Sequence, residues 1–168
     1  DAAYIEVVKG EEKPLMAKAE VFLADDAHQK IEGRSVDVSK VSLFKIGVSL
    51  RTTEDRSYEG HVSLISEDVN TKEKIDVKGI NDEVSVSSSF DVPLYSYWLS
   101  KRNLPWTDGH TYLFRVMGEI GGKEVELKNP QEPSCFLKRK GDILILYQDI
   151  ATGIENATIS DTETVISR

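Results

Sequence analysis

The stretch Val41–Ser66 constrains the fold more strongly than any other part of the chain. It contains two runs in which apolar and polar residues alternate, and the charged loop Thr52–Gly60 separates them. A period of two residues is typical of a β-strand that has one face on a hydrophobic core and the other toward water. The two runs therefore predict a pair of strands. The expected inward side chains are Phe44, Ile46, Val48, Leu50, Val62 and Leu64, and Lys45 falls on the face toward water.

Other short runs with the same period follow at spacings of about ten residues, which favours an all-β sandwich over alternating strands and helices. Leu15–Ala24 has a composition that permits a helix, but its alternation favours a strand. Gly121–Gly122 predicts a two-residue hairpin turn, because both positions of such a turn need positive φ. The other expected strands are 74–78, 83–92 with Pro93 at its end, 112–116, 123–128, 135–138 and 142–147. We expect an antiparallel β-sandwich of about seven to nine strands, with one short helical turn near residues 95–103.

The two ends of the chain differ from this pattern. Tyr4–Val8 is a short apolar run, and a charged turn that contains Gly10 and Pro14 follows it. Residues 149–168 are rich in Ser and Thr with scattered Ile and Val. We therefore expect one β-sandwich domain over 1–148 and a linker, or the start of a C-terminal tail, over 149–168.

The composition excludes several classes of partner and site. The 168 residues carry a net charge of −8, which disfavours nucleic acid because phosphate binding needs clustered Lys and Arg. No apolar run approaches the length of about 20 residues that spans a bilayer. Cys135 is the single cysteine, so the sequence permits neither an internal disulfide nor a zinc site built on cysteines.

Three segments together resemble the immunoglobulin-like or fibronectin-like accessory domains of secreted bacterial proteins, which are related to cell-adhesion modules. The segments are Val41–Ile65, Ser89–Leu94 and Asp108–Val116. Tyr112 is similar to the tyrosine at the start of the sixth strand of such domains, whose hydroxyl bonds to backbone upstream. This resemblance implies an immunoglobulin-like sandwich.

The end of the chain carries a second resemblance. Thr152–Glu155, followed by Val165–Arg168, is similar to the junction that leads into the C-terminal sorting tails of secreted Bacteroidetes proteins. Together the two resemblances imply an extracytoplasmic β-sandwich within a larger exported protein, either secreted or at the cell surface.

Aromatic residues gather before the predicted strand at 112–116, among polar and charged neighbours. Exposed rings of this kind can stack on the apolar faces of sugars. The alternative is that both Trp side chains fill one end of the core and that their N–H groups bind loop carbonyls. The candidate ligand-binding residues are Tyr95, Tyr97, Trp98 and Trp106.

The remaining polar residues predict no catalytic centre, metal site or cofactor. Acidic pairs such as Asp25–Asp26 and Glu67–Asp68 do not form a calcium-loop motif and are expected to be solvated. The three histidines are far apart in the sequence, and Cys135 lies in a strand-like pattern that is typical of a buried structural thiol.

These observations predict a non-catalytic accessory module that serves as a spacer, a stabilising domain or a protein-interaction domain. Its expected partners are other domains of the parent protein or extracellular proteins and glycans. A carbohydrate-binding module that uses the aromatic residues is the alternative, and a small hydrolase is the third possibility. Fold alone does not decide between them.

Overall fold

The computed structural model describes residues 17–52, 56–87, 91–128 and 132–149, and these residues form antiparallel β-sheets. The only helical element among them is the short 3₁₀ turn η2 at Lys101–Asn103, inside the segment where a helical turn was expected. The described residues contain ten strands, slightly more than the sequence predicted: β1 Ala17–Asp25, β2 Ser35–Asp37, β3 Phe44–Thr52, β4 Ser57–Asp68, β5 Lys74–Ser87, β6 Val92–Tyr95, β7 Thr111–Ile120, β8 Lys123–Glu126, β9 Ser134–Lys140 and β10 Ile143–Asp149.

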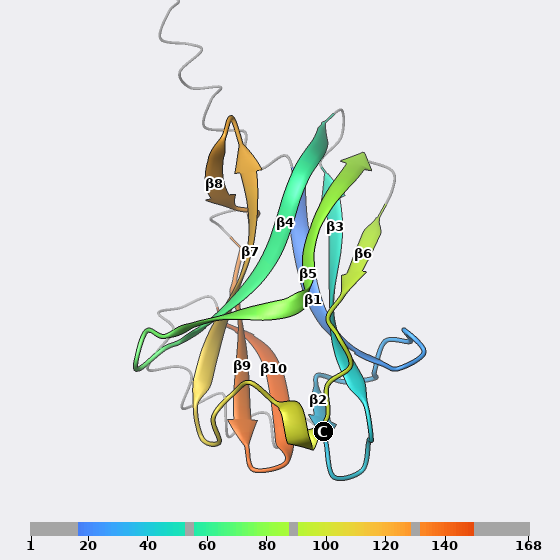
Figure 1. Ribbon diagram of the computed structural model, residues 1–168, viewed down its shortest axis with the longest axis vertical. Helices are drawn as coiled ribbons and strands as arrows, with labels where there is room; N and C mark the ends of the chain where they lie inside the picture. Colours follow the sequence, from blue (N-terminus) through green and yellow to red (C-terminus); the bar gives the residue numbers. More distant parts are fainter. Residues whose placement is uncertain (1–16, 53–55, 88–90, 129–131, 150–168) are drawn as a thin grey trace, which may run out of the picture.

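The strands form two sheets that enclose one main core (Figure 1). The smaller sheet has the order β1-β3-β6, and the larger has the order β2-β10-β9-β7-β4-β5 with β8 added to β7. Alternate residues of β3 and β4 point into the core between the sheets, as the sequence predicts. Phe44, Ile46, Val48, Leu50, Val62 and Leu64 are all fully buried there.

Two local predictions from glycine and from apolar patterning are confirmed. Gly121 and Gly122 have φ of 63° and 82° and connect β7 to β8, as a primed hairpin turn requires. The run in β10 is covered on both faces, because Leu144 and Leu146 join the main core. Ile145 on the opposite face packs in a second cluster that includes Phe136 and Tyr147.

The region between 74 and 95 differs from the prediction. The runs that were expected to form two strands are parts of the single strand β5, and Pro93 lies inside β6 instead of ending a strand. β6 tolerates proline because it is the last strand of the smaller sheet.

One side of the sandwich is closed by a bend in β5. The register between β4 and β5 shifts between Ser63 and Ile65, so β5 contains extra residues at this point. Gly79 in the bend has φ of 96°, and the Tyr97 N–H next to β6 donates a hydrogen bond to the Lys78 carbonyl at 3.2 Å. The bend therefore brings β5 of the larger sheet next to the residues that follow β6 in the smaller sheet. The open side of the molecule lies at β1.

Candidate functional site

Trp106 belongs to the core and is not part of an exposed aromatic surface. Its side chain is 1% exposed and packs at an angle against Phe114. The indole N–H donates to Ser66 Oγ at 3.1 Å, so the polar atom of the ring is satisfied inside the protein. A ring in this position has no free face for a ligand, which removes Trp106 from the predicted set.

The other three aromatic residues lie on the outer face of the smaller sheet or next to it. Tyr97 is 65% exposed and Trp98 is 50% exposed, whereas Tyr95 is partly buried. The ring of Tyr95 stacks on the imidazole of His28 with centroids 4.0 Å apart. The structure therefore brings Tyr95, Tyr97 and Trp98 to one region of the surface.

Lys45 lies beneath the rings of Tyr95 and Trp98, although its place in the alternating pattern predicted exposure to water. The residue is 5% exposed, and its ammonium group lies 4.8 Å from the Trp98 ring centroid and 6.0 Å from that of Tyr95. Its Nζ is 2.8 Å from His28 Nε2, and because an ammonium group only donates, the imidazole nitrogen accepts. Lys45 and His28 are thus additional residues of this cluster.

His28 reaches the cluster because of the loop that follows β1. The Asp25 carboxylate accepts hydrogen bonds from the backbone N–H groups of Ala27 and Gln29, at 2.9 and 2.8 Å. This local turn places His28 in the left-handed region with φ of 68°. No pattern in the sequence connects this loop to residues 95–98, so the cluster could not have been found from spacing.

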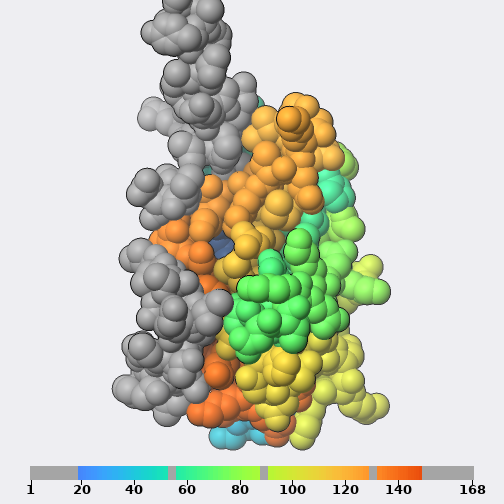
Figure 2. Space-filling model, turned by 90° about the vertical axis from the view of Figure 1, so that its left-hand side faces the viewer, coloured from blue at the N-terminus to red at the C-terminus, as the bar shows by residue number. Residues whose placement is uncertain are grey.

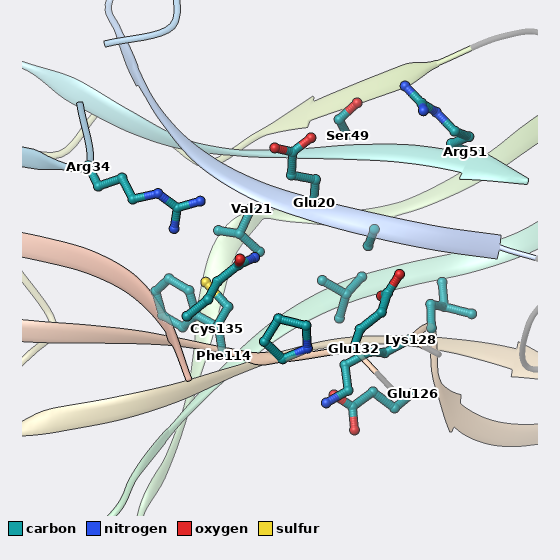
Figure 3. Close-up of a pocket in the computed structure, with 15 residues that line it drawn as sticks. Glu20, Val21, Arg34, Ser49, Arg51, Phe114, Glu126, Lys128, Glu132 and Cys135 are labelled. Carbon is teal, nitrogen blue, oxygen red and sulfur yellow. The ribbon is translucent and has the colours of Figure 1, made fainter. Parts of the chain in front are cut away.

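The open side of the sandwich carries a groove along β1. A cavity of about 450 Å³ lies between β1 and the segment from β7 to β10 (Figure 3). Val21 and Cys135 face each other across it, and Phe114 forms part of its apolar floor. Figure 2 shows β1 in blue at the bottom of a hollow that the orange side chains of the β7–β9 region surround.

A second cavity continues this groove toward the end of β1. Its volume is about 400 Å³, and it shares Glu20, Val21 and Arg34 with the first. The charged side chains around the groove carry both signs, with Arg34, Arg51 and Lys128 against Glu20, Glu126 and Glu132. The groove is therefore long, has an apolar floor and has no dominant charge.

The backbone at this groove is a sheet edge. Within the described residues β1 pairs with β3 alone over its first half, and an isolated bridge from Ala24 to Lys30 covers its end. The Leu23 carbonyl accepts the Ile31 N–H at 2.9 Å on the side away from β3. Because backbone groups alternate between the two sides of an antiparallel strand, Ala19 and Val21 also point their N–H and C=O groups to this outer side.

The Cys135 thiol in the groove is not activated as a nucleophile. Burial raises its pKa to about 12, with a smaller opposing effect from the charge of Arg34. A thiol with this pKa stays protonated at neutral pH, and only the thiolate is a good nucleophile. This geometry does not favour thiol chemistry.

The structure also joins His110 to Asp68 at the ends of β7 and β4. His110 Nδ1 lies 2.6 Å from an oxygen of the Asp68 carboxylate, which is 3% exposed. The same carboxylate accepts hydrogen bonds from the N–H groups of Asn70 and Thr71. Such a pair orients an imidazole in many active sites, but within the described part of the chain no Ser or Cys side chain forms a hydrogen bond with His110.

No group of three or more His, Cys, Asp or Glu side chains with the geometry to hold a metal ion occurs among the described residues. In the same part of the chain no helix has the length and apolar character that a membrane span requires. Comparisons of the chain with models of protein families, with curated proteins and with solved structures found no match.

Proposed function

We propose that this domain is a non-catalytic accessory module of a larger exported protein, and that it binds an extended polypeptide segment of a partner along the outer edge of β1. The observation that carries the proposal is the outward-facing edge at Ala19 and Val21, which lies beside the continuous groove. An added strand would bond to this edge through its backbone and place alternate side chains on the apolar floor.

The shape and charge of the groove favour an extended polypeptide as its ligand over a compact small molecule. The two cavities together follow the strand direction instead of converging on one enclosed space. Val21 and Phe114 offer apolar contacts, whereas the charges at the rim have both signs and select for neither an anion nor a cation. A neutral backbone with alternating apolar side chains fits this surface best.

The extracytoplasmic location and the kinship with immunoglobulin-like domains belong to the same proposal and rest on the sequence resemblance. One contact supports the comparison with such domains. The Tyr112 hydroxyl accepts a hydrogen bond from the Thr107 N–H at 2.7 Å, which joins the start of β7 to the preceding loop as a tyrosine corner does.

A proline substitution at the edge tests the binding mode. Ala19→Pro removes an N–H that points away from β3, so the pairing within the sheet is kept while the added strand loses a donor and meets the proline ring. Peptides selected from a displayed library of random dodecamers would be titrated against the natural chain and the variant by fluorescence anisotropy. We expect a loss of affinity of about tenfold or more, equivalent to about 1.4 kcal/mol.

The matched control is Ala19→Ser, which keeps the backbone donor and should bind within about twofold of the natural chain. Circular dichroism would establish that both variants are folded. Failure to enrich any peptide, or equal affinity of the enriched peptides for Ala19→Pro and the natural chain, would overturn the proposed binding site.

A second candidate function is carbohydrate binding at Tyr97 and Trp98. The observation that favours it is the exposure of both rings, together with the Lys45 ammonium group that lies 4.8 Å from the centroid of the Trp98 ring. Screening the natural chain on a glycan array and repeating any positive result with Trp98→Ala tests this function. Binding that survives the loss of the Trp98 ring, or an array without binding, would exclude it.

A further inference from the structure

We propose that the partner segment carries an Asp or Glu side chain that pairs with Arg34, two residues away from a large apolar side chain that fills the cavity next to Phe114. This inference rests on the strand-addition site proposed above and names the chemistry of the strand that occupies it. Arg34 would select this strand from other extended segments that have the same apolar pattern but no acidic residue.

Arg34 lies where the two parts of the groove meet. It lines both cavities, as Val21 of β1 does. Its carbonyl accepts the Leu146 N–H at 2.7 Å, which fixes its backbone beside β10. Figure 3 shows the Arg34 guanidinium group directed toward Val21 and Cys135. The side chain therefore extends over the groove.

The charge of Arg34 acts on the floor of the groove. Burial raises the pKa of the Cys135 thiol, and the positive charge of Arg34 is the effect that opposes it. Guanidinium groups keep their charge in proteins. A ligand in the groove therefore meets a permanent positive charge at the level of Val21.

The other charged side chains of the first cavity interact with residues of the protein itself. Glu132 has such an interaction, and the closest atoms in the other contacts lie 3.1 to 3.9 Å apart. Within the described residues, to which neither Tyr4–Val8 nor residues 150–168 belong, the Arg34 side chain makes no hydrogen bond or ion pair. Arg34 is thus the charged group of this cavity that remains available to a ligand in the described part of the chain. The other contacts are Arg51 with Asp91, Glu126 with Arg115, Glu20 with Lys30 and Lys128 with Ser134.

The spacing of the two side chains of the ligand follows from β1. Ala19 and Val21 pack against the main core, so residues opposite them on an added strand would point to the same side. The residue at the level of Val21 would meet Arg34, and the residue at the level of Ala19 would enter the first cavity next to Phe114. Side chains on one face of a strand are two residues apart. The expected pattern is therefore one acidic and one large apolar residue with a single residue between them.

A carboxylate is the group that pairs best with Arg34. A guanidinium group and a carboxylate form two parallel hydrogen bonds, which are stronger than those to a neutral amide. Glu20 does not fill this role, because Figure 3 shows its carboxylate directed away from Arg34 and toward Ser49. An added strand would also cover the pair and exclude water from it, which strengthens the attraction.

Peptides selected on the natural chain from the library of random dodecamers test the pattern. We expect Asp or Glu to be enriched two residues from a large apolar residue. The selected peptides would be synthesised with an amidated C-terminus, so that only a side-chain carboxylate can pair with Arg34, and titrated by fluorescence anisotropy. Replacing the acidic residue of the peptide by its amide should weaken binding to the natural chain about fivefold or more, but by less than about twofold for Arg34→Gln.

The matched control is Arg51→Gln. Arg51 lines the same cavity but is paired with Asp91, so this variant should bind the peptides within about twofold of the natural chain. A library reselected on Arg34→Glu should yield Lys or Arg in place of the acidic residue. Circular dichroism would establish that the three variants are folded.

Three results would overturn the pairing: selected peptides without an enriched acidic residue, equal losses of affinity in Arg34→Gln and Arg51→Gln, or binding that is lost when the C-terminus is amidated. The last result would assign Arg34 to a terminal carboxylate.

The two proposals fail in different ways. Peptides that are sensitive to Ala19→Pro but bind equally well to Arg34→Gln would keep strand addition and remove the pairing with Arg34. Peptides that depend on Arg34 but are insensitive to Ala19→Pro would keep the contact with Arg34 and show that no strand is added to β1.

Discussion

The Nδ1 atom of His110 lies 2.6 Å from Oδ2 of Asp68, although 42 residues separate them in the chain. Asp68 ends β4 and His110 immediately precedes β7, the strand that pairs with β4. Asp68 also accepts the backbone N–H groups of Asn70 and Thr71, so one carboxylate holds both the turn after β4 and the start of β7. This arrangement indicates a structural role for the pair.

Replacing Asp68 by Ala should lower the free energy of unfolding by about 2 to 3 kcal/mol, because three hydrogen bonds to a buried carboxylate are lost. The measurement is urea denaturation followed by circular dichroism. Asp76→Ala on the exposed side of β5 is the control and should change stability little. Equal stabilities of the two variants would show that the Asp68 contacts contribute nothing net.

The same carboxylate should make stability depend on pH in the acid range. Burial alone would raise the pKa of Asp68, but hydrogen bonds from His110 and from the Thr71 and Asn70 amides outweigh it and lower the pKa below 3.8. A lowered folded-state pKa contributes stability above pH 3.8 that is lost as the pH falls through the folded value. Unfolding measured from about pH 5 to pH 2 should therefore show a smaller loss for Asp68→Asn than for the natural chain.

The strands were predictable from the sequence because burial on one face imposes a period of two on neighbouring residues. Phe44, Ile46 and Val48 follow this rule and are fully buried. Lys45 breaks it, because its outward face is covered by His28 and by the rings of Tyr95 and Trp98, which are distant in sequence. The alternation of apolar and polar residues within one strand does not indicate which loop covers the outer face of the sheet.

The segment that contains Trp98 and Trp106 is a second case in which contacts distant in sequence decide burial. Trp98 and Trp106 lie in one stretch of similar composition, yet Trp98 is half-exposed and Trp106 is in the core. Their directions depend on the path of the loop before β7 and on the position of Ser66, which accepts the Trp106 N–H. The groove was also beyond prediction, because it forms where β1 lacks an outer neighbour, which is a property of the strand order.

The different surroundings of the two tryptophans predict distinct fluorescence. Trp106 is 1% exposed, so Trp98→Phe should leave emission at short wavelength that acrylamide quenches weakly. Trp106→Phe should leave emission at longer wavelength that is readily quenched. It should also cost about 1 to 2 kcal/mol, because the buried hydrogen bond from the indole N–H to Ser66 Oγ is lost. Quenching that is equal in the two variants would contradict the burial of Trp106.

Gly79 should be the least replaceable glycine in the described strands. A Cβ atom there would lie 2.6 Å from the Tyr97 backbone nitrogen, and φ of 96° is also unfavourable for other residues. We expect Gly79→Ala to cost about 3 kcal/mol or more, because backbone atoms of both sheets must separate. Gly33→Ala is the matched control, since Gly33 has φ of 80° with open space around it. Strain alone should cost about 1 kcal/mol there, as thermal denaturation can measure.

Two isoleucines of β10, Ile143 and Ile145, test the position of the second cluster. Ile145 is 3% exposed and packs with Phe136 and Tyr147, whereas Ile143 at the start of the strand is 41% exposed. Ile145→Lys should lower the free energy of unfolding by about 4 kcal/mol or more, because it buries an unpaired charge. Ile143→Lys should stay within about 0.5 kcal/mol of the natural chain, because its ammonium group remains in water. Similar denaturation midpoints for the two lysine variants would mean that Ile145 is not part of a packed cluster.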